Sequence, residues 1–407
     1  MAANNPGSGV DVDVGVSSVN GPSFSAVMNP DIWHLVFGHI ESPRDLYNAC
    51  LTSRAWSNMA APHLYKIVPL RRSLCSRWDW DHKTDPMVFA HSLSSRLLDT
   101  RNEQLRRAVG ELDFGDFGDQ TEFSEMEERL VALVHSLPNL RRVKIRGRLT
   151  QEALQGIGGH SKRIALHLLG EDGRRPVGND LKNVVAIAAQ VCPSAERSGP
   201  NRDILGLQKL LFACPNLTSF SLGIRGGYGG CVRRIPRFSN IHSFQFAGDE
   251  TFPPLQELSL SGYRLSEEEW EHWQKGLRWS KLTSLALGPT YMADFLKLAA
   301  GYANCLQNLE VKVYTDDDRK ITCPPLEHFL TTFTSLESLI VRGYRLPISL
   351  IGRHSGLRDL CLHTFERGKE GYVRPTLDIE QLQELDKACP NLETLEIDLY
   401  RDGVWPE

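Results

Sequence analysis

The chain has 407 residues, of which 41% are hydrophobic and 24% charged, a composition typical of a globular protein with one large core or two domains. Its 46 Lys and Arg residues against 50 Asp and Glu residues give a net charge of −4, so we expect no nucleic-acid partner and no membrane partner on the basis of charge. No apolar run has the length of a membrane span, and the first residues lack the pattern of a signal peptide, so we expect a cytoplasmic or nuclear protein.

Residues 1–24 are rich in Gly, Ser and Asn and predict a disordered tail. A compact helical module follows at residues 25–66. Asn29 can cap a first helix that begins at Pro30. The apolar residues of this helix recur at helical spacing, at Ile32, Leu35, Val36 and Ile40.

Two further short helices are predicted in the same module. Ser42 and Pro43 open a second helix, whose apolar positions are Leu46, Cys50 and Leu51, and Ser53 leads into a third helix that carries Trp56. Three helices of this size bury little surface alone, so either the following domain or a partner must cover the apolar face.

This module resembles an F-box. The matching residues are Pro30, Ile32, Leu35, Val36, Ile40, Leu46, Cys50, Arg54 and Trp56, whereas Asn29 stands where the family commonly has leucine. The resemblance implies that these residues, except Arg54, dock onto the Skp adaptor of cullin-based ubiquitin ligases. The alternative is an ordinary helical cap that seals the end of the next domain.

Residues 67–108 are expected to form a helical linker or cap, with a helix from Pro86 to about Arg107. From residue 109 to 407 the spacing L-x-x-L-x-L recurs. The clearest copies begin at Leu140, Leu217, Leu255, Leu282, Leu306, Leu336, Leu357 and Leu392, with an earlier copy around Leu112. From Leu255 onward the starts lie 27, 24, 30, 21 and 35 residues apart, mostly near the length expected for leucine-rich repeats, and the last, longer interval implies an insertion on the convex side.

Amphipathic helices are predicted between these strand motifs, for example after the capping box of Ser266 and Glu269. Alternating strands and helices with right-handed crossovers favour an α/β fold, an irregular solenoid with parallel strands on the concave side and helices on the convex side. Residues 147–215 are the least regular part, where we expect a strand near Ile164 and a helix from about Leu181 to Val191.

The combination resembles the F-box and leucine-rich repeat proteins that are abundant in fungi. The resemblance implies a substrate-recognition subunit of a Skp-cullin-F-box ubiquitin ligase, with a Skp-type adaptor, a cullin scaffold and a protein substrate as partners. Such a subunit is not an enzyme and uses no cofactor, and the sequence has no P-loop, nucleophile elbow or H-E-x-x-H motif. The alternative is a repeat scaffold that binds proteins without recruiting the ligase.

Strand side chains between the leucines should form the concave, substrate-binding surface. The charged positions are Arg142, Lys144, Arg146, Glu257, Glu310, Lys312, Arg342, Asp359, His363, Glu396 and Asp398. They suggest a basic early end and an acidic late end, separated by small residues such as Ser221 and Ser284. We hypothesise that this bipolar surface orients a partner; the alternative is a set of solvated strand faces.

Nine cysteines have no C-x-x-C spacing and indicate reduced thiols. Two ACPNL phrases place Cys214 and Cys389 at equivalent repeat positions, where buried structural cysteine is expected. Cys361 and His363 are two residues apart, but a zinc site needs about four ligands, and no second Cys/His pair accompanies them. The sequence therefore predicts no metal site.

Overall fold

The computed structural model describes residues 29–71, 86–115, 120–147, 149–169, 181–191, 202–224, 244–246, 248, 250–288, 291–313, 316–364 and 376–398. The chain divides into two compact units, Met1–Tyr65 (unit 1) and Lys66–Glu407 (unit 2). The tail expected at residues 1–24 lies outside the described residues.

Unit 1 contains the three predicted helices, α1 (Pro30–Gly38), α2 (Pro43–Thr52) and α3 (Arg54–Leu64). A polar side chain caps the start of each helix by accepting a hydrogen bond from a backbone N–H group. Asn29 accepts from Asp31 at 3.0 Å, Ser42 from Asp45 at 3.3 Å, and Ser53 from Trp56 at 3.2 Å. The cap assigned to Asn29 from the sequence is confirmed.

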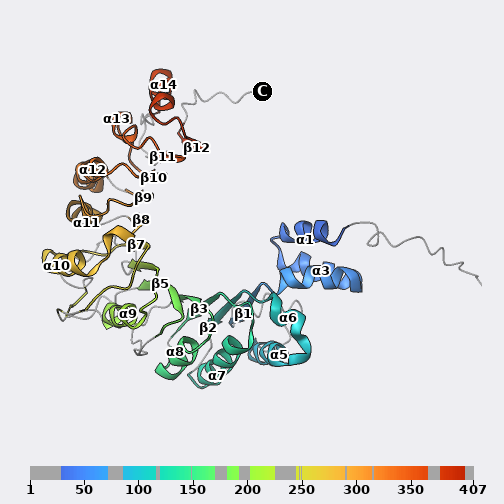
Figure 1. Cartoon of the computed structure of the whole chain (residues 1–407). Helices are drawn as coiled ribbons and strands as arrows, with labels where there is room; N and C mark the ends of the chain where they lie inside the picture. The colour runs from blue at the N-terminus through green and yellow to red at the C-terminus, as the bar shows by residue number, and fades with distance from the viewer. Residues whose placement is uncertain are drawn as a thin grey trace, which may run out of the picture. The chain divides into compact units, whose positions relative to one another are not determined.

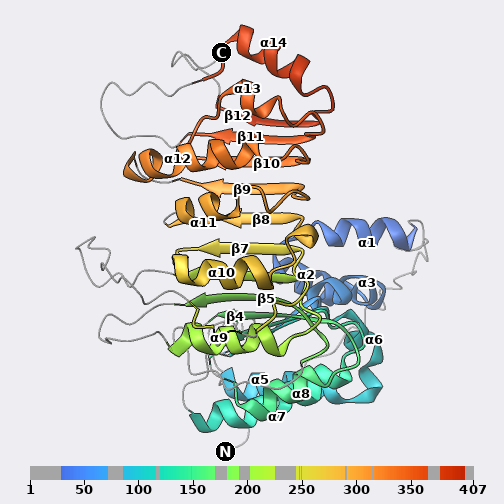
Figure 2. The same ribbon diagram turned by 60° about the vertical axis from the view of Figure 1, so that its left-hand side comes forward.

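Unit 2 is built on a parallel sheet in which, among the described residues, twelve strands lie in the order of the chain. The strands are β1 (Ile67–Arg71), β2 (Glu111–Gly115), β3 (Arg142–Arg146), β4 (Ile164–Leu169), β5 (Val184–Val191), β6 (Ser219–Ile224), β7 (Glu257–Ser261), β8 (Ser284–Leu287), β9 (Asn308–Lys312), β10 (Ser338–Arg342), β11 (Asp359–His363) and β12 (Thr394–Ile397). Figure 2 shows the labelled strands from β4 to β12 stacked one above another.

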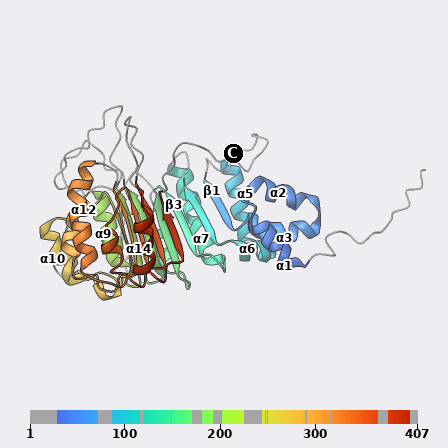
Figure 3. The same cartoon turned by 90° about the horizontal axis from the view of Figure 1, so that it is seen from above.

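Helices connect most of the successive strands of unit 2, and among the described residues none lies between β4 and β5 or between β6 and β7. They are α5 (Pro86–Leu98), α6 (Glu103–Ala108), α7 (Gln120–Ser136), α8 (Gln151–Gly158), α9 (Arg202–Ala213), α10 (Glu267–Gly276), α11 (Met292–Ala299), α12 (Asp316–Thr331), α13 (Ile348–Ile351) and α14 (Ile379–Ala388), with 3₁₀ turns η2 (Thr100–Asn102) and η3 (Trp279–Lys281). Helices α7 to α14 follow the outer side of the curved sheet (Figure 1), and α9, α10 and α12 lie along one side of the strands in Figure 3.

This arrangement confirms an α/β solenoid with a parallel sheet. Within the described part of the chain, no helix combines the length and the apolar character needed to cross a bilayer.

The core of unit 2 combines buried apolar side chains of the helices with those of the strands, and the strand residues form ladders along the sheet. The strand registers align Leu112, Val143, Leu166, Ile187, Phe220, Leu258, Leu285, Leu309, Leu339 and Leu360, all of them at most 1% exposed. Each residue of the ladder packs against its equivalents in the neighbouring repeats, so the core is continuous along the stack.

The two ACPNL phrases occupy equivalent positions in their repeats, as predicted. Cys214 and Cys389 directly follow α9 and α14 and are 0% and 2% exposed. The asparagines of the two phrases, Asn216 and Asn391, donate side-chain hydrogen bonds of 2.8 and 3.0 Å to the Lys182 and Ser355 carbonyls of the preceding repeats. The phrase thus supplies a buried thiol and an amide that ties one repeat to the next.

Two predictions about the elements of unit 2 are wrong. Ile67–Arg71, expected within a helical linker, is strand β1, which pairs with β2 from Ile67 opposite Glu111 onward. The expected helix at residues 181–191 is strand β5, with Val184, Ile187, Ala189 and Val191 buried. The sheet therefore begins before residue 109 and continues through the irregular region, where a strand near Ile164 is confirmed as β4.

Candidate functional site

Helix α1 is apolar on two faces, and only one of them packs inside the protein. Trp33 and Phe37 lie one turn apart and are 9% and 1% exposed. The Trp33 ring centroid is 4.9 Å from that of Trp56 on α3, and Phe37 meets the same indole edge-on at 5.6 Å. These three aromatic rings hold α1 against α3.

The other face of α1 carries three exposed aliphatic side chains, Ile32, Leu35 and Val36, which we call the α1 apolar surface. They are 45%, 67% and 43% exposed. Their spacing of three and four residues places them side by side on the helix. On α2, Tyr47 and Leu51 are a further exposed pair at 41% and 67%. Exposed apolar side chains that lie together in a patch often mark an interaction surface, whereas single exposed apolar residues are common on any protein.

The other residues that the F-box resemblance assigned to adaptor binding lie differently. Leu46 is 5% exposed and belongs to the interior of unit 1, so its side chain is not placed to contact an adaptor directly. Trp56, Cys50 and Ile40 are half-buried, and nothing is described of the Pro30 side chain. The exposed Tyr47 was not predicted, although its spacing of four residues from Leu51 was a signal for a shared face.

The predicted concave residues share the face of the sheet opposite the apolar ladders. Strand β3 shows the alternation, because Val143 and Ile145 are buried whereas Arg142, Lys144 and Arg146 are not. The strand registers carry this face through Glu257 on β7, Glu310 and Lys312 on β9, Arg342 on β10, Asp359 and His363 on β11, and Glu396 on β12. We call this face, including Asp398 just beyond β12, the open face.

At the early end of the open face, β2 supplies two acidic residues, Glu111 and Asp113. Arg142 and Lys144 lie 2.9 and 2.5 Å from the carboxylate oxygens of Glu111, and Arg146 lies 3.4 Å from Asp113. Both carboxylates belong to buried residues, 6% and 5% exposed. The expected basic end is therefore a network of ion pairs, in which two negative charges offset most of the three positive charges.

The pKa of Glu111 reflects this network. Burial alone raises the pKa of the carboxyl group, but the neighbouring Lys144 and Arg142 outweigh that effect and hold the pKa below its ordinary value. The sequence reading missed Glu111 and Asp113, because it took only the apolar residues of this strand into account.

At the late end of the open face, His363 lies between two carboxylates. Its Nδ1 atom is 3.1 Å from Asp398 Oδ1, and its Nε2 atom is 3.7 Å from Glu396 Oε2. Asp398 Oδ2 accepts hydrogen bonds from the Thr364 N–H group at 2.6 Å and from its hydroxyl at 2.9 Å. The acidic character predicted for this end is present, and it is concentrated around one histidine.

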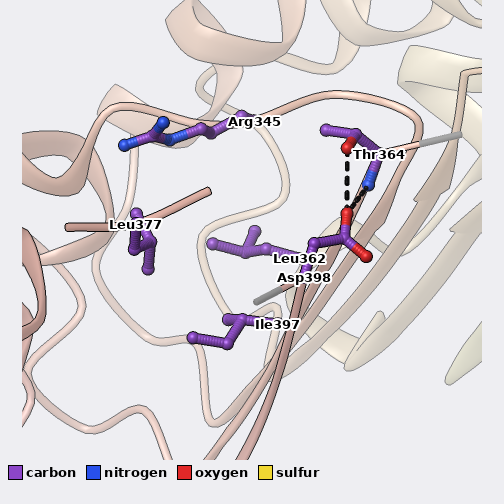
Figure 4. Close-up of a pocket in the computed structure, with 6 residues that line it drawn as sticks. All are labelled: Arg345, Leu362, Thr364, Leu377, Ile397 and Asp398. Carbon is purple, nitrogen blue, oxygen red and sulfur yellow. Dashed lines mark hydrogen bonds between the residues drawn. The ribbon is translucent and has the colours of Figure 1, made fainter. Parts of the chain in front are cut away.

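A small pocket lies beside this group (Figure 4). Its lining consists of Arg345, Leu362, Thr364, Leu377, Ile397 and Asp398. The space inside it is about 10 Å³, roughly enough for one water molecule. Arg345 donates to the Thr376 carbonyl at 2.8 Å and to the side chain of Gln381. This pocket is too small for a substrate and acts as a packing feature next to Asp398.

Comparison with known proteins does not add a family assignment, since no family model matches the chain and no curated protein matches it significantly.

Proposed function

We propose that this protein is the substrate receptor of a Skp-cullin-F-box ubiquitin ligase and works in the cytoplasm or nucleus. In this proposal unit 1 is an F-box that binds a Skp-type adaptor, and through it the cullin, while the leucine-rich repeats of unit 2 bind a protein substrate. The chain then contributes effective concentration rather than chemistry, because it holds a substrate close to the ubiquitin-transferring enzyme.

The observation that carries the proposal is the α1 apolar surface. Ile32, Leu35 and Val36 are exposed on a three-helix unit whose interior is already filled by Trp33, Phe37 and Leu46. Full burial of such a side chain contributes about 1.5–3 kcal/mol, so covering three half-exposed ones provides several kcal/mol toward binding. The same three residues match the F-box pattern in the sequence.

The open face of unit 2 supports the second half of the proposal. Parallel strands β1 to β12 present a row of side chains on the open face, and helices α7 to α14 follow the other side of the sheet in Figure 1. Small residues such as Ser221, Ser259 and Ala286 occupy its middle strands in register. A protein segment can therefore approach the backbone closely there, while charged side chains at both ends fix its orientation.

A pull-down of the tagged full-length protein from its native cells tests the adaptor interaction. The double variant Ile32→Asp/Leu35→Asp should lose the Skp-type adaptor, because two carboxylates would have to be desolvated in the interface. The matched control is Val88→Asp, which places the same charge at a 58% exposed apolar position of unit 2 and should keep the adaptor.

Equal recovery of the adaptor by the wild type and the double variant, or recovery by neither, would contradict the proposal. The chain would then be better described as a repeat scaffold that binds proteins without recruiting the ligase.

A further inference from the structure

Strands β11 and β12 bring together three side chains of different chemistry on the open face. The parallel register sets Cys361 opposite Glu396, and His363 follows Cys361 on the same face of β11. One potential ligand atom from each residue, the thiol sulfur, an imidazole nitrogen and a carboxylate oxygen, lies within 4.8 Å of the other two. From this geometry we propose that Cys361, His363 and Glu396 bind one zinc ion.

The hydrogen bonds around His363 prepare its ring for such a role. Asp398 Oδ1 is 3.1 Å from Nδ1, and Thr364 holds the other oxygen of Asp398 through its N–H and hydroxyl groups. A carboxylate at this distance keeps the proton on Nδ1, which leaves the Nε2 lone pair for a metal ion. Asp398 is thus a positioning residue, which orients the imidazole.

The distances suit a tetrahedral ion. Ligand atoms about 2.1 Å from zinc lie roughly 3.4 Å from one another in that geometry. His363 Nε2 and Glu396 Oε2 are already 3.7 Å apart. The Glu396 side chain is 58% exposed and can rotate toward an ion, while Cys361 is held in the sheet at 5% exposure.

The charges and the donor types favour zinc over calcium or magnesium. One sulfur and one nitrogen among three ligands exclude the all-oxygen environments that calcium and magnesium prefer. A thiolate and a carboxylate together neutralise the two charges of the ion. Burial first, and then the neighbouring Glu396, raise the pKa of the Cys361 thiol to about 11; Arg342 on β10, the register partner of His363, acts to lower it and Glu310 on β9 acts to raise it.

Three protein ligands leave the fourth zinc position to water on the open face. The sequence predicted no metal site because it showed only Cys361 and His363 together. Glu396 reaches them only through the pairing of β11 with the following strand. This inference is independent of adaptor binding, since it concerns only residues of β11, β12 and the turn after each strand.

Titration of the full-length protein with Co²⁺ tests the proposal, because cobalt replaces zinc and reports its ligands by colour. One equivalent of Co²⁺ should give a thiolate-to-cobalt charge-transfer band that Zn²⁺ abolishes. Cys361→Ser should remove that band, and His363→Ala or Glu396→Gln should weaken Zn²⁺ binding at least about 10-fold. Asp398→Asn should weaken it about 10–100-fold, as found for residues that orient metal-bound histidines.

The control is Cys305→Ser, which removes an exposed thiol elsewhere in unit 2 and should leave the band and the affinity unchanged. Glu396→Gln alters an exposed side chain and so remains informative if Cys361→Ser fails to fold. Absence of a thiolate band in the wild type would overturn the proposal. So would a band that survives in Cys361→Ser, or zinc affinity that is unchanged in Glu396→Gln.

Discussion

At the scale of single residues, the ion pairs of Glu111 show how the structure changes the meaning of a charge pattern. Three basic residues on one strand suggested a positively charged surface, yet two buried acids on the preceding strand face them across the parallel ladder. Alternation along a strand predicts which side chains share a face. It does not predict which opposite charges the register brings beside them, because that depends on how the strands align.

Glu111→Gln should destabilise the protein by about 1–3 kcal/mol near neutral pH, because the buried carboxylate then no longer balances Arg142 and Lys144. The pKa of Glu111 is lower in the folded chain than its ordinary value near 4.5. Its contribution is therefore complete above about pH 4.5 and is lost as the pH falls through the lower, folded-state pKa.

Chemical denaturation at a series of pH values measures this difference. The gap in unfolding free energy between the wild type and Glu111→Gln should narrow as the solution becomes more acidic. Glu393→Gln is the control, because it removes one partner of an exposed pair with Arg358 and should change stability by less than about 0.5 kcal/mol. A gap that widens on acidification would contradict the explanation.

At the scale of elements, the strands with a leucine pattern could be predicted and two strands without it could not. The run at Val184–Val191 mixes β-branched residues with alanines, so its apolar content fits a helix or a buried strand equally well. Strand β1 contains Pro69, which lacks a backbone donor, so this segment is unfavourable for a strand inside a sheet. It is tolerated because β1 is an edge strand, with β2 as its only partner among the described strands.

The repeated phrase GYRL marks the ends of β7 and β10 for a physical reason. Gly262 and Gly343 have φ angles of +71° and +92°, which favour glycine, and the tyrosines after them donate hydroxyl hydrogen bonds to Glu269 and Glu327. A Cβ atom on Gly262 would lie 2.4 Å from the Ile224 carbonyl oxygen of the neighbouring repeat. The glycine thus allows the turn and the close approach of two repeats.

Gly262→Ala should lower the unfolding free energy by about 2–4 kcal/mol, because it combines strain at positive φ with a backbone clash. Gly301→Ala is a matched control, since its φ of +84° carries the strain while nothing lies within 4 Å of the added atom. It should cost only about 1 kcal/mol. Thermal and urea unfolding of both variants give the comparison, and equal losses would refute the role assigned to the Ile224 contact.

Helix α1 illustrates what an apolar pattern leaves open. The sequence predicted the helix, its cap and one apolar face, but it did not identify Trp33 and Phe37, which form a second apolar face on the same helix. The structure assigns Trp33 and Phe37 to the interior and Ile32, Leu35 and Val36 to the surface. The position of the candidate site on α1 could therefore be predicted from the sequence. That Leu46 is buried, and so does not belong to the exposed surface, could be seen only from the packing of α2.

Phe37→Ala should destabilise unit 1 by about 3–5 kcal/mol, since it removes a buried ring that packs against Trp56. Leu35→Ala, on the exposed face of the same helix, should change stability by less than about 0.5 kcal/mol. Hydrogen exchange of the full-length protein, read on peptides from residues 29–65, should show faster exchange in Phe37→Ala alone. Comparable acceleration in Leu35→Ala would mean that Leu35 supports the fold rather than a partner interface.

At the scale of the whole molecule, the proposal combines a three-helix unit that offers an apolar surface with a solenoid that offers a long open face. Each unit has its own filled interior, so removal of surface residues on one should leave the fold of the other intact. The proposed division of roles therefore requires that adaptor binding and substrate binding respond to separate mutations.

The most direct test of the central claim is the affinity of the purified full-length protein for a purified Skp-type adaptor, measured by titration calorimetry. Our account predicts a one-to-one complex. Its affinity should fall at least about 100-fold, or roughly 2.7 kcal/mol, in Ile32→Asp/Leu35→Asp and remain unchanged in Val88→Asp. No binding by the wild type, or equal affinity in the wild type and the double variant, would contradict the claim that unit 1 recruits the ligase.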